Sequence, residues 1–181
     1  MILLYLATGV LALGVLFWQA NLLLIAIFGT PIVYANSRAI RDAYKLAELK
    51  KGQMVVDLGC GNAKSLILAT REFGAKGVGV DLSLYCYLKS KINVILAGQS
   101  KNITIIWGDF KVAKRYLAHA DVVYLYLLNS TLKKIELWFF ASISPKTKVV
   151  SLSFEFPKHN PLKTILTVNL KKRTQIHLYW K

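Results

Sequence analysis

The sequence predicts an α/β fold built around a mainly parallel sheet that helices cover on both faces. Five apolar runs of strand length alternate with helix-compatible stretches. Near-continuous apolar strands separated by helices are typical of a parallel sheet buried on both faces. The 181-residue chain is 55% hydrophobic and 18% charged, which excludes intrinsic disorder. Alternation and composition therefore both favour one folded α/β domain with a short appendage.

The expected elements follow one another along the chain. A helix capped by Asn36 or Ser37 should run to about Leu49. The strands are expected at Met54–Leu58, Gly77–Val80, Ile103–Trp107, Val122–Leu128 and Val149–Phe154, and the helices between them at Lys64–Phe73, Leu84–Ala97, Lys111–Leu117 and Leu132–Ile143. No helix fits between Phe156 and Leu162, so we expect a loop there.

The C-terminal residues break this rhythm. Apolar and polar residues alternate from Leu166 to Lys171 and again from Gln175 to Trp180. A period of two is typical of antiparallel strands. With Lys171-Lys172-Arg173 between them, the two segments predict a hairpin at the sheet edge and a sheet of seven strands in total. Because it alternates outward in this hairpin, His177 is expected at the surface.

The first 28 residues differ from the rest of the chain. Residues 2–28 carry no charged side chain, and at about 1.5 Å per residue a helix of this length exceeds the ~30 Å hydrocarbon core of a membrane. All 24 Lys and Arg residues lie at Arg38 or later. The positive-inside rule then predicts a single-pass membrane protein whose folded domain lies on the cytoplasmic side. A cleaved signal peptide and a helix buried in a soluble protein are the alternatives.

We expect three segments along the chain: an anchor at 1–28, a linker and helix at 29–52, and the sheet domain at 53–181. The formal net charge is +15. It favours an anionic partner, which is the membrane surface in the first place and nucleic acid in the second. Because Cys60 and Cys86 lie in no CxxC or Cys/His cluster, neither a disulfide framework nor a metal site is expected.

The candidate site lies at the carboxyl ends of the strands, where open α/β sheets bind their ligands. Asp57 ends the first strand and precedes the turn Gly59-Cys60-Gly61, whose glycines permit a tight turn and a close approach of a ligand. Asp81 ends the second strand, where a carboxylate can accept hydrogen bonds from two ribose hydroxyls. Lys64 stands where a dinucleotide-binding GxGxxG pattern needs its third glycine, so that pattern does not fit. Each residue alone would also suit a turn or a cap.

Together these residues resemble the motifs of the class I S-adenosylmethionine-dependent methyltransferases. The segment from Asp57 to Ala63 is similar to their glycine-rich first motif, with Ala63 in place of the third glycine, and Trp107-Gly108-Asp109-Phe110 looks like their adenine-contacting motif. The resemblance implies a Rossmann-like seven-stranded methyltransferase sheet with S-adenosylmethionine as cofactor. It implies that the cofactor is bound by Asp57, Gly59, Cys60, Gly61, Asp81, Leu82, Asp109 and Phe110.

Further segments narrow the resemblance. Gly29-Thr30-Pro31-Ile32-Val33, the run at 121–128 and Phe154-Glu155-Phe156-Pro157 are similar to small membrane-anchored protein-lysine methyltransferases. That group modifies the ATP synthase c subunit and the adenine nucleotide translocase, and it has prokaryotic relatives. The resemblance covers nearly the whole chain and implies a lysine acceptor on a membrane protein. The chain departs from the group at Tyr34-Ala35-Asn36-Ser37 and at Asn129, where prolines are usual.

The chemistry of the cofactor sets what the site must do. A methyl group on a sulfonium is already activated, so the enzyme mainly holds a neutral nucleophile in line with it. Asn129, Tyr126 and Glu155, at or near the ends of the fourth and fifth strands, are the candidates to orient the acceptor. The alternative for these positions is that Tyr124 and Tyr126 are core residues and that Glu155 is a surface residue. Two other functions remain open: a methyltransferase for RNA or a small molecule, and a non-catalytic sensor of S-adenosylmethionine.

Overall fold

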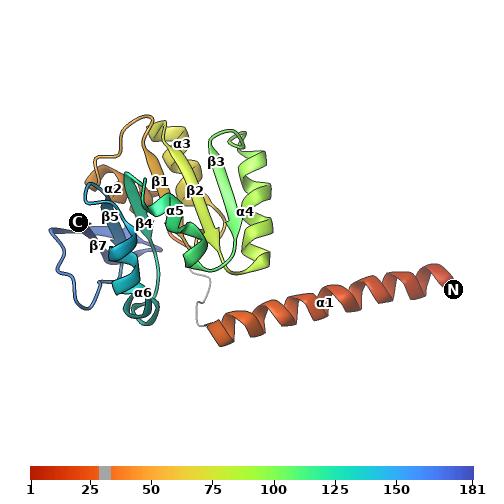
Figure 1. Ribbon diagram of the computed structural model, residues 1–181. Coiled ribbons are helices and arrows are strands. Elements are labelled where there is room, and N and C mark those ends of the chain that lie inside the picture. The colour runs from red at the N-terminus through yellow and green to blue at the C-terminus, as the bar shows by residue number, and fades with distance from the viewer. Residues whose placement is uncertain (29–33) are drawn as a thin grey trace. The chain divides into compact units, whose positions relative to one another are not determined.

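The computed structural model describes the backbone of residues 1–28 and 34–181, and the side chains of residues 1, 4–20, 22–23 and 34–181. The chain divides into two compact units, Met1–Pro31 and Ile32–Lys181. Helix α1 (Ile2–Phe28) belongs to the first unit (Figure 1). Its described side chains are exposed. The Gly29–Val33 motif of the sequence lies outside the described residues.

The predicted membrane span is wrong. Among the described residues, no helix combines the length and the apolar character that a crossing requires. The predicted single-pass topology, and with it the placement of the domain on the cytoplasmic side, are therefore not supported.

The second unit is a seven-stranded sheet with helices on both faces (Figure 1). Its elements are α2 (Ser37–Leu46), β1 (Met54–Leu58), α3 (Lys64–Phe73), β2 (Lys76–Asp81), α4 (Leu84–Leu96), β3 (Ile103–Trp107), the 3₁₀ turn η1 (Phe110–Ala113), α5 (Lys114–Leu117), β4 (Val122–Leu125), α6 (Asn129–Ser142), β5 (Lys148–Leu152), β6 (Lys163–Asn169) and β7 (Lys172–Trp180). The strand order is β3-β2-β1-β4-β5-β7-β6. Strands β1 to β5 are parallel, and β7 runs antiparallel to β5 and β6. The predicted sheet is confirmed.

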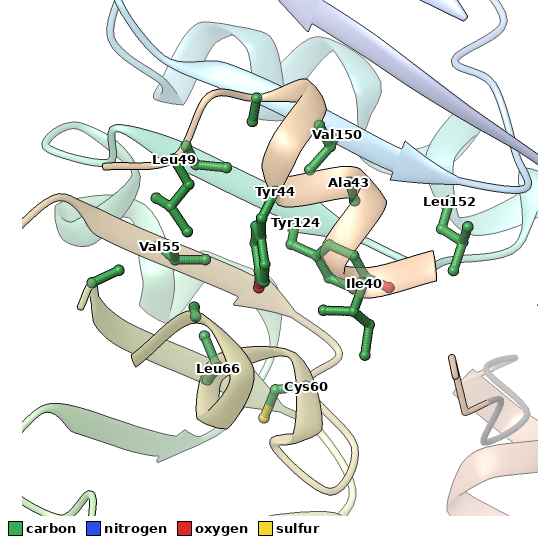
Figure 2. Packing of buried hydrophobic residues seen from close by; sticks show 14 of the residues in the cluster. Ile40, Ala43, Tyr44, Leu49, Val55, Cys60, Leu66, Tyr124, Val150 and Leu152 are labelled. Atoms are coloured by element: carbon green, nitrogen blue, oxygen red, sulfur yellow. The ribbon is translucent and has the colours of Figure 1, made fainter. Parts of the chain in front are cut away.

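The core has two halves because successive residues of a strand point to opposite faces of a sheet. On one face Val55 of β1 packs with α2 and α3, where Ile40 and Tyr44 are fully buried (Figure 2). On the other face Val56 packs with α5 and α6, whose Phe139 is also fully buried. Helix α2 is thus part of the sheet's own core, and its position is fixed by packing.

The C-terminal hairpin lies at the sheet edge, as predicted, but its turn differs from the prediction. A two-residue turn at Leu170 and Lys171, with φ of 48° and 67°, joins Asn169 directly to its partner Lys172. Positive φ at both turn positions matches the right-handed twist of the two strands. The edge strand is β6, whereas β7 lies inside the sheet, paired with both β5 and β6.

His177 was expected at the surface, and this prediction is wrong because β7 lies inside the sheet. Its side chain on β7 is buried beside Thr164 of β6, whose hydroxyl oxygen lies 3.1 Å from Nδ1. Burial lowers the pKa of His177, and the nearby Glu155 charge opposes this shift only in part.

Candidate functional site

The candidate site lies where the strand order reverses. Chain connections leave β1 toward β2 and β3 on one side, and β4 lies on the other side of β1. Ligands of open α/β sheets bind at the carboxyl ends of the strands at such a switch point. A cavity of about 340 Å³, part of it open to solvent, lies there. It is lined by the segment before α2, the glycine turn with the start of α3, and the end of β4.

The glycine turn is shaped by positive φ angles. Gly59 has φ +80° and Gly61 has φ +58°, a region in which side chains are strained. The amides of Gly59 and Cys60 both donate to the carbonyl of Val80, at 2.8 and 3.1 Å, which ties the turn to β2. A Cβ at Gly79 would lie 2.8 Å from the Cys60 Sγ, so the buried thiol packs against β2. The side chain of Cys60 is therefore a packing group.

Asp81 holds the turn from the end of β2. Its Oδ2 accepts from the Gly61 amide at 2.8 Å, and its Oδ1 accepts from the Ser83 amide at 2.9 Å. The carboxylate is 9% exposed, and burial raises its pKa although both amide hydrogen bonds oppose the shift. Each oxygen keeps a lone pair that a hydroxyl donor can use. Asp81 thus combines a structural role in the turn with a capacity to bind a ligand.

Asp57 is the more deeply buried carboxylate, with 3% of its surface exposed. Ser65 at the start of α3 donates a hydrogen bond to Oδ2. Burial raises the pKa of Asp57 to about 7; the Ser65 hydrogen bond opposes this shift, and the Asp81 charge adds to it. A buried carboxylate whose charge is stabilised by so few hydrogen bonds is a natural partner for a cation.

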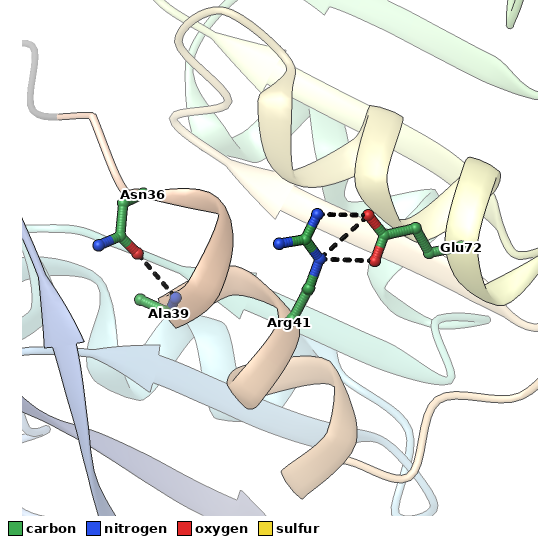
Figure 3. Close-up of polar contacts among 4 residues, drawn as sticks. All are labelled: Asn36, Ala39, Arg41 and Glu72. Carbon is green, nitrogen blue, oxygen red and sulfur yellow. Dashed lines mark hydrogen bonds and ion pairs between the residues drawn. The ribbon is translucent and has the colours of Figure 1, made fainter.

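Tyr126 follows β4 and belongs to a polar chain at the cavity wall. Its hydroxyl accepts from Asn169 Nδ2 at 3.0 Å, and Asn169 Oδ1 accepts from the Asn36 amide at 2.8 Å. Asn36 Oδ1 in turn caps α2 by accepting from the Ala39 amide at 2.8 Å (Figure 3). The end of β4, the hairpin and the start of α2 are thereby held together around the cavity.

Two further contacts fix the segment before α2 over the glycine turn. Lys64 Nζ donates to the Ala35 carbonyl at 3.2 Å. Lys89 Nζ lies 3.4 Å from the Tyr34 hydroxyl and 5.2 Å from the centre of its ring. Farther along α2, Arg41 forms an ion pair with Glu72 of α3 at 2.7 Å (Figure 3). Lys64 and Lys89 therefore hold the segment before α2 through Ala35 and Tyr34, which both line the cavity.

The other predicted cofactor-binding residues lie beside Asp81. Strands β2 and β3 end in register at Asp81 and Trp107, and the Gly108 amide donates to the Asp81 carbonyl at 3.0 Å. Asp109 is exposed and caps η1 by accepting from the Lys111 amide at 2.9 Å. Phe110 is half-buried against the second core half, and the Leu82 carbonyl accepts from Trp107 Nε1 at 3.0 Å. These residues form the outer part of the same sheet edge.

The three residues that were predicted to orient the acceptor do not lie together. Tyr126 lines the cavity. Asn129 is the exposed first residue of α6, and Glu155 is exposed with Oε1 3.2 Å from His177 Nδ1. Neither belongs to the described residues that line the cavity.

Sequence reasoning did not name several cavity-lining residues as ligand-binding candidates, among them Tyr34, Lys64, Ser65 and Tyr124. For Tyr124 the missing information was the strand order, since β4 pairs with β1 so that Tyr124 lies opposite Asp57. For Ser65 the sequence held a usable signal, because it begins the helix that follows the glycine turn.

Several known proteins are similar to this chain in sequence or in structure. A protein-lysine N-methyltransferase of Saccharolobus islandicus is 26% identical over 150 residues, covering 82% of this chain and 92% of the relative. The structure of an RNA methyltransferase from Salinibacter ruber, solved with S-adenosylhomocysteine, is 29% identical with a TM-score of 0.74 and covers 82% and 93% of the two chains. A methyltransferase from Thiobacillus denitrificans, at 22% identity and a TM-score of 0.53 over 67% and 51%, shares the fold.

The strand order and the glycine turn at the switch point define a class I methyltransferase, the class that uses S-adenosylmethionine as cofactor. Residues 57–163 match the ANTKMT methyltransferase domain. Because this match spans more than half of the sequence, the chain belongs to the ANTKMT methyltransferase family.

Proposed function

We propose that the protein is a protein-lysine N-methyltransferase. The observation that carries the proposal is the cavity at the switch point, which places a buried carboxylate and tyrosine hydroxyls beside the glycine turn. Tyrosine hydroxyls at a poorly hydrated wall can position a neutral amine acceptor through hydrogen bonds. The name of the Saccharolobus islandicus relative, which aligns over 92% of its own length, supports the same acceptor.

The residues present fit the cofactor. A Cβ at Gly59 would approach the Leu127 side chain to 3.0 Å, so glycine fits this position better than a residue with a side chain. We propose that Gly59 and Gly61 give the cofactor access to the backbone and that Asp81 accepts hydrogen bonds from its ribose. Asp57, Leu82, Asp109 and Phe110 complete the proposed set, with Cys60 contributing through its place in the turn. When bound, the cofactor supplies a methyl group on a positively charged sulfur.

On the acceptor side, this chain's residues position an amine and keep it neutral. Tyr126 is our first candidate to orient the acceptor, because its hydroxyl is held by Asn169 at the cavity wall. Asn129 and Glu155 remain candidates for contacts with a larger substrate outside the cavity. Lys64 and Lys89 near the mouth place positive charge where it disfavours a protonated amine.

We propose that two segments of the chain have different roles. Residues 53–181 hold the cofactor, while the segment 34–46, with the cap of α2, contributes to the acceptor side. The cavity wall contributed by Tyr34 and Ile40 supports this assignment.

A methyl-transfer assay tests the function. The full chain would be incubated with S-adenosylmethionine labelled in its methyl group and with a cell protein extract as the source of acceptors. The proteins would then be hydrolysed in acid and their amino acids analysed. We expect label in Nε-methylated lysine, and its loss with the Asp81→Ala variant. Absence of labelled lysine, although the wild type binds the cofactor, would refute a lysine acceptor.

RNA is the second candidate acceptor. Two observations favour it: the formal net charge of +15, and the name of the Salinibacter ruber enzyme at 29% identity. Phosphate binding by basic residues falls steeply with salt concentration. Label that is sensitive to nuclease and resistant to protease would establish RNA as the acceptor.

A further inference from the structure

The turn of the C-terminal hairpin carries residues that its backbone disfavours. Leu170 and Lys171 occupy the two central positions, with φ of 48° and 67°. A two-residue turn with positive φ at both positions favours asparagine and glycine, because other side chains are strained there. Both side chains are exposed, and 58% of the Leu170 surface is accessible, so neither residue is retained for packing in the core. Such strain persists mainly where function requires it.

The turn begins a run of three cations. Lys171, Lys172 and Arg173 are consecutive, and all three are exposed. The ion pairs between described residues include none of the three. Asp42 and Glu155, two acidic residues in contact with the hairpin, bind other side chains of its strands. The positive charge at the turn is therefore available to an anionic partner.

An exposed aliphatic side chain lies on the same hairpin. Leu166 of β6 is 69% exposed. Alternate residues of a strand, and residues that pair directly across two antiparallel strands, stand on the same face. Because Arg173 pairs with Val168, two residues after Leu166, the leucine and the arginine share one face. Helix α2 contacts the other face, where Asp42 accepts from the Thr167 hydroxyl at 2.6 Å. The face away from α2 thus combines apolar surface with positive charge.

The turn lies next to the candidate site. Strand β5 ends at Leu152, which pairs with Ile176, so the part of the hairpin that contains the turn extends beyond the carboxyl end of β5. Asn169, the residue before the turn, donates to the hydroxyl of Tyr126 in the cavity lining. A macromolecule with one side chain in the cavity would therefore lie beside the turn.

We propose that residues 170–173, here called the hairpin tip, bind together with Leu166 an acidic segment of a partner protein that also carries apolar side chains. Carboxylates match the three cations, and aliphatic side chains of the partner cover the two leucines. RNA fits less well, because residues 166–175 include no aromatic side chain on which a base could stack. The identification of this partner as the methyl acceptor rests on the proposed function, whereas its binding at the hairpin tip does not.

The test compares two variants of the full chain with the same change of net charge. The tip variant replaces the three cations of the hairpin tip by alanine. The edge variant replaces Lys50, Lys76 and Lys101 by alanine. These exposed lysines lie at or just before the starts of β1, β2 and β3, which is the opposite edge of the sheet.

The probe is a short fluorescein-labelled peptide with a central lysine among Asp, Glu and Leu residues. Its binding is measured by fluorescence anisotropy with S-adenosylhomocysteine present, so that no methyl transfer takes place. The tip variant should bind the peptide about tenfold more weakly than the wild type, and the edge variant should lose less than about twofold. Calorimetry should show unchanged affinity for S-adenosylhomocysteine in both variants.

The Leu170→Asn variant tests the strained turn. Asparagine tolerates positive φ, so the melting temperature should be at least that of the wild type. The loss of an apolar contact should weaken peptide binding about threefold or more. Weaker binding by a variant that is no less stable is a result that a purely structural role of the turn would not give.

Three results would overturn the inference. One is equal weakening in the tip and edge variants, which would show that net charge alone attracts the peptide. Another is equal binding of a matched peptide with Asn and Gln in place of Asp and Glu. The third is tighter binding of a single-stranded RNA, or of phosphatidylserine vesicles, that only the tip variant loses. Peptide binding at the hairpin tip without labelled lysine in the methyl-transfer assay would refute the proposed function alone.

Discussion

The two ends of the candidate site differ in how their polar groups are satisfied. In the outer site, formed by Asp81, Leu82, Asp109 and Phe110, both carboxylates have hydrogen-bond donors within the protein: Asp81 binds the Gly61 and Ser83 amides, and Asp109 binds the Lys111 amide. The inner site, formed by Asp57, Ser65, Tyr124 and Tyr126, depends on elements far apart in the chain. Asn169 holds Tyr126 from the hairpin, and the Tyr124 hydroxyl lacks a partner within the described residues.

This difference indicates what each end contributes. The outer site is ordered by hydrogen bonds within the protein before any ligand arrives, which suits the binding of a constant ligand such as a nucleoside. The inner site keeps a desolvated carboxylate and an unpaired hydroxyl, which a native protein retains mainly where function requires them. The four predictions below test this contrast, from the largest expected effect to the smallest.

The pH dependence of stability should report the inner carboxylate. The pKa of Asp57 is about 7 in the folded protein and near 3.8 in the unfolded chain. Between these values the folded state binds more protons, so the free energy of unfolding falls as pH rises from about 4 to about 7, by up to about 4 kcal/mol, and this contribution is constant at higher pH. Urea denaturation at a series of pH values would measure the loss.

Asp57→Asn should flatten this pH profile, because an amide does not titrate, whereas Asp109→Asn at the outer site should preserve it. An unchanged profile in Asp57→Asn would show that other groups cause the pH dependence.

Removing the outer carboxylate should cost the most cofactor affinity. Asp81→Ala loses the acceptor of the Gly61 and Ser83 amides and the proposed partner of the ribose. Charge-assisted hydrogen bonds are worth about 1.5–3 kcal/mol each, which predicts a loss of about a hundredfold or more in affinity for S-adenosylmethionine. Calorimetric titration would measure it. If exposed Asp109→Ala lost as much, Asp81 would have no special role at the outer site.

The glycine turn between the two sites should tolerate alanine unequally. Gly59→Ala combines φ +80° with a Cβ 3.0 Å from Leu127, whereas Gly61→Ala at φ +58° meets only Tyr34, at an ordinary 3.7 Å. Left-handed backbone costs about 1–2 kcal/mol for an L-residue, so both variants should be destabilised by about that amount. Gly59→Ala should be the less stable of the two in thermal denaturation. The reverse order would mean that the Leu127 side chain moves aside freely.

The polar chain behind the inner site should contribute a smaller amount. Asn169→Ala removes the hydrogen bonds to Tyr126 and to the Asn36 amide, which predicts a loss of about 1–2 kcal/mol in the free energy of unfolding. Exposed Asn102→Ala is the matched control and should change stability by less than about 0.5 kcal/mol. Equal effects of the two variants in urea denaturation would show that the chain does not support the inner site.

Much of the fold could be predicted because its signals are local. The Asn36 cap of α2 and the helix at Lys64–Phe73 follow from propensity and spacing within a few residues. Two predictions failed for nonlocal reasons. Strand β4 ends at Leu125, whose partner Leu58 is the last residue of β1, although the apolar run continues to Leu128. His177 is buried because β7 lies inside the sheet, which the alternation of one strand cannot reveal.

The sequence by itself determined the class of protein and the outer site. The glycine turn and Asp81 lie at strand ends that short apolar runs already mark, and the Asp81 contact to Ser83 spans only two residues. The tertiary structure decided the inner site. Tyr124 faces Asp57 only because β4 pairs with β1, and Tyr126 meets Asn169 only because the hairpin folds back beside α2. Contacts between residues distant in the chain depend on strand order and packing, which no local pattern of residues specifies.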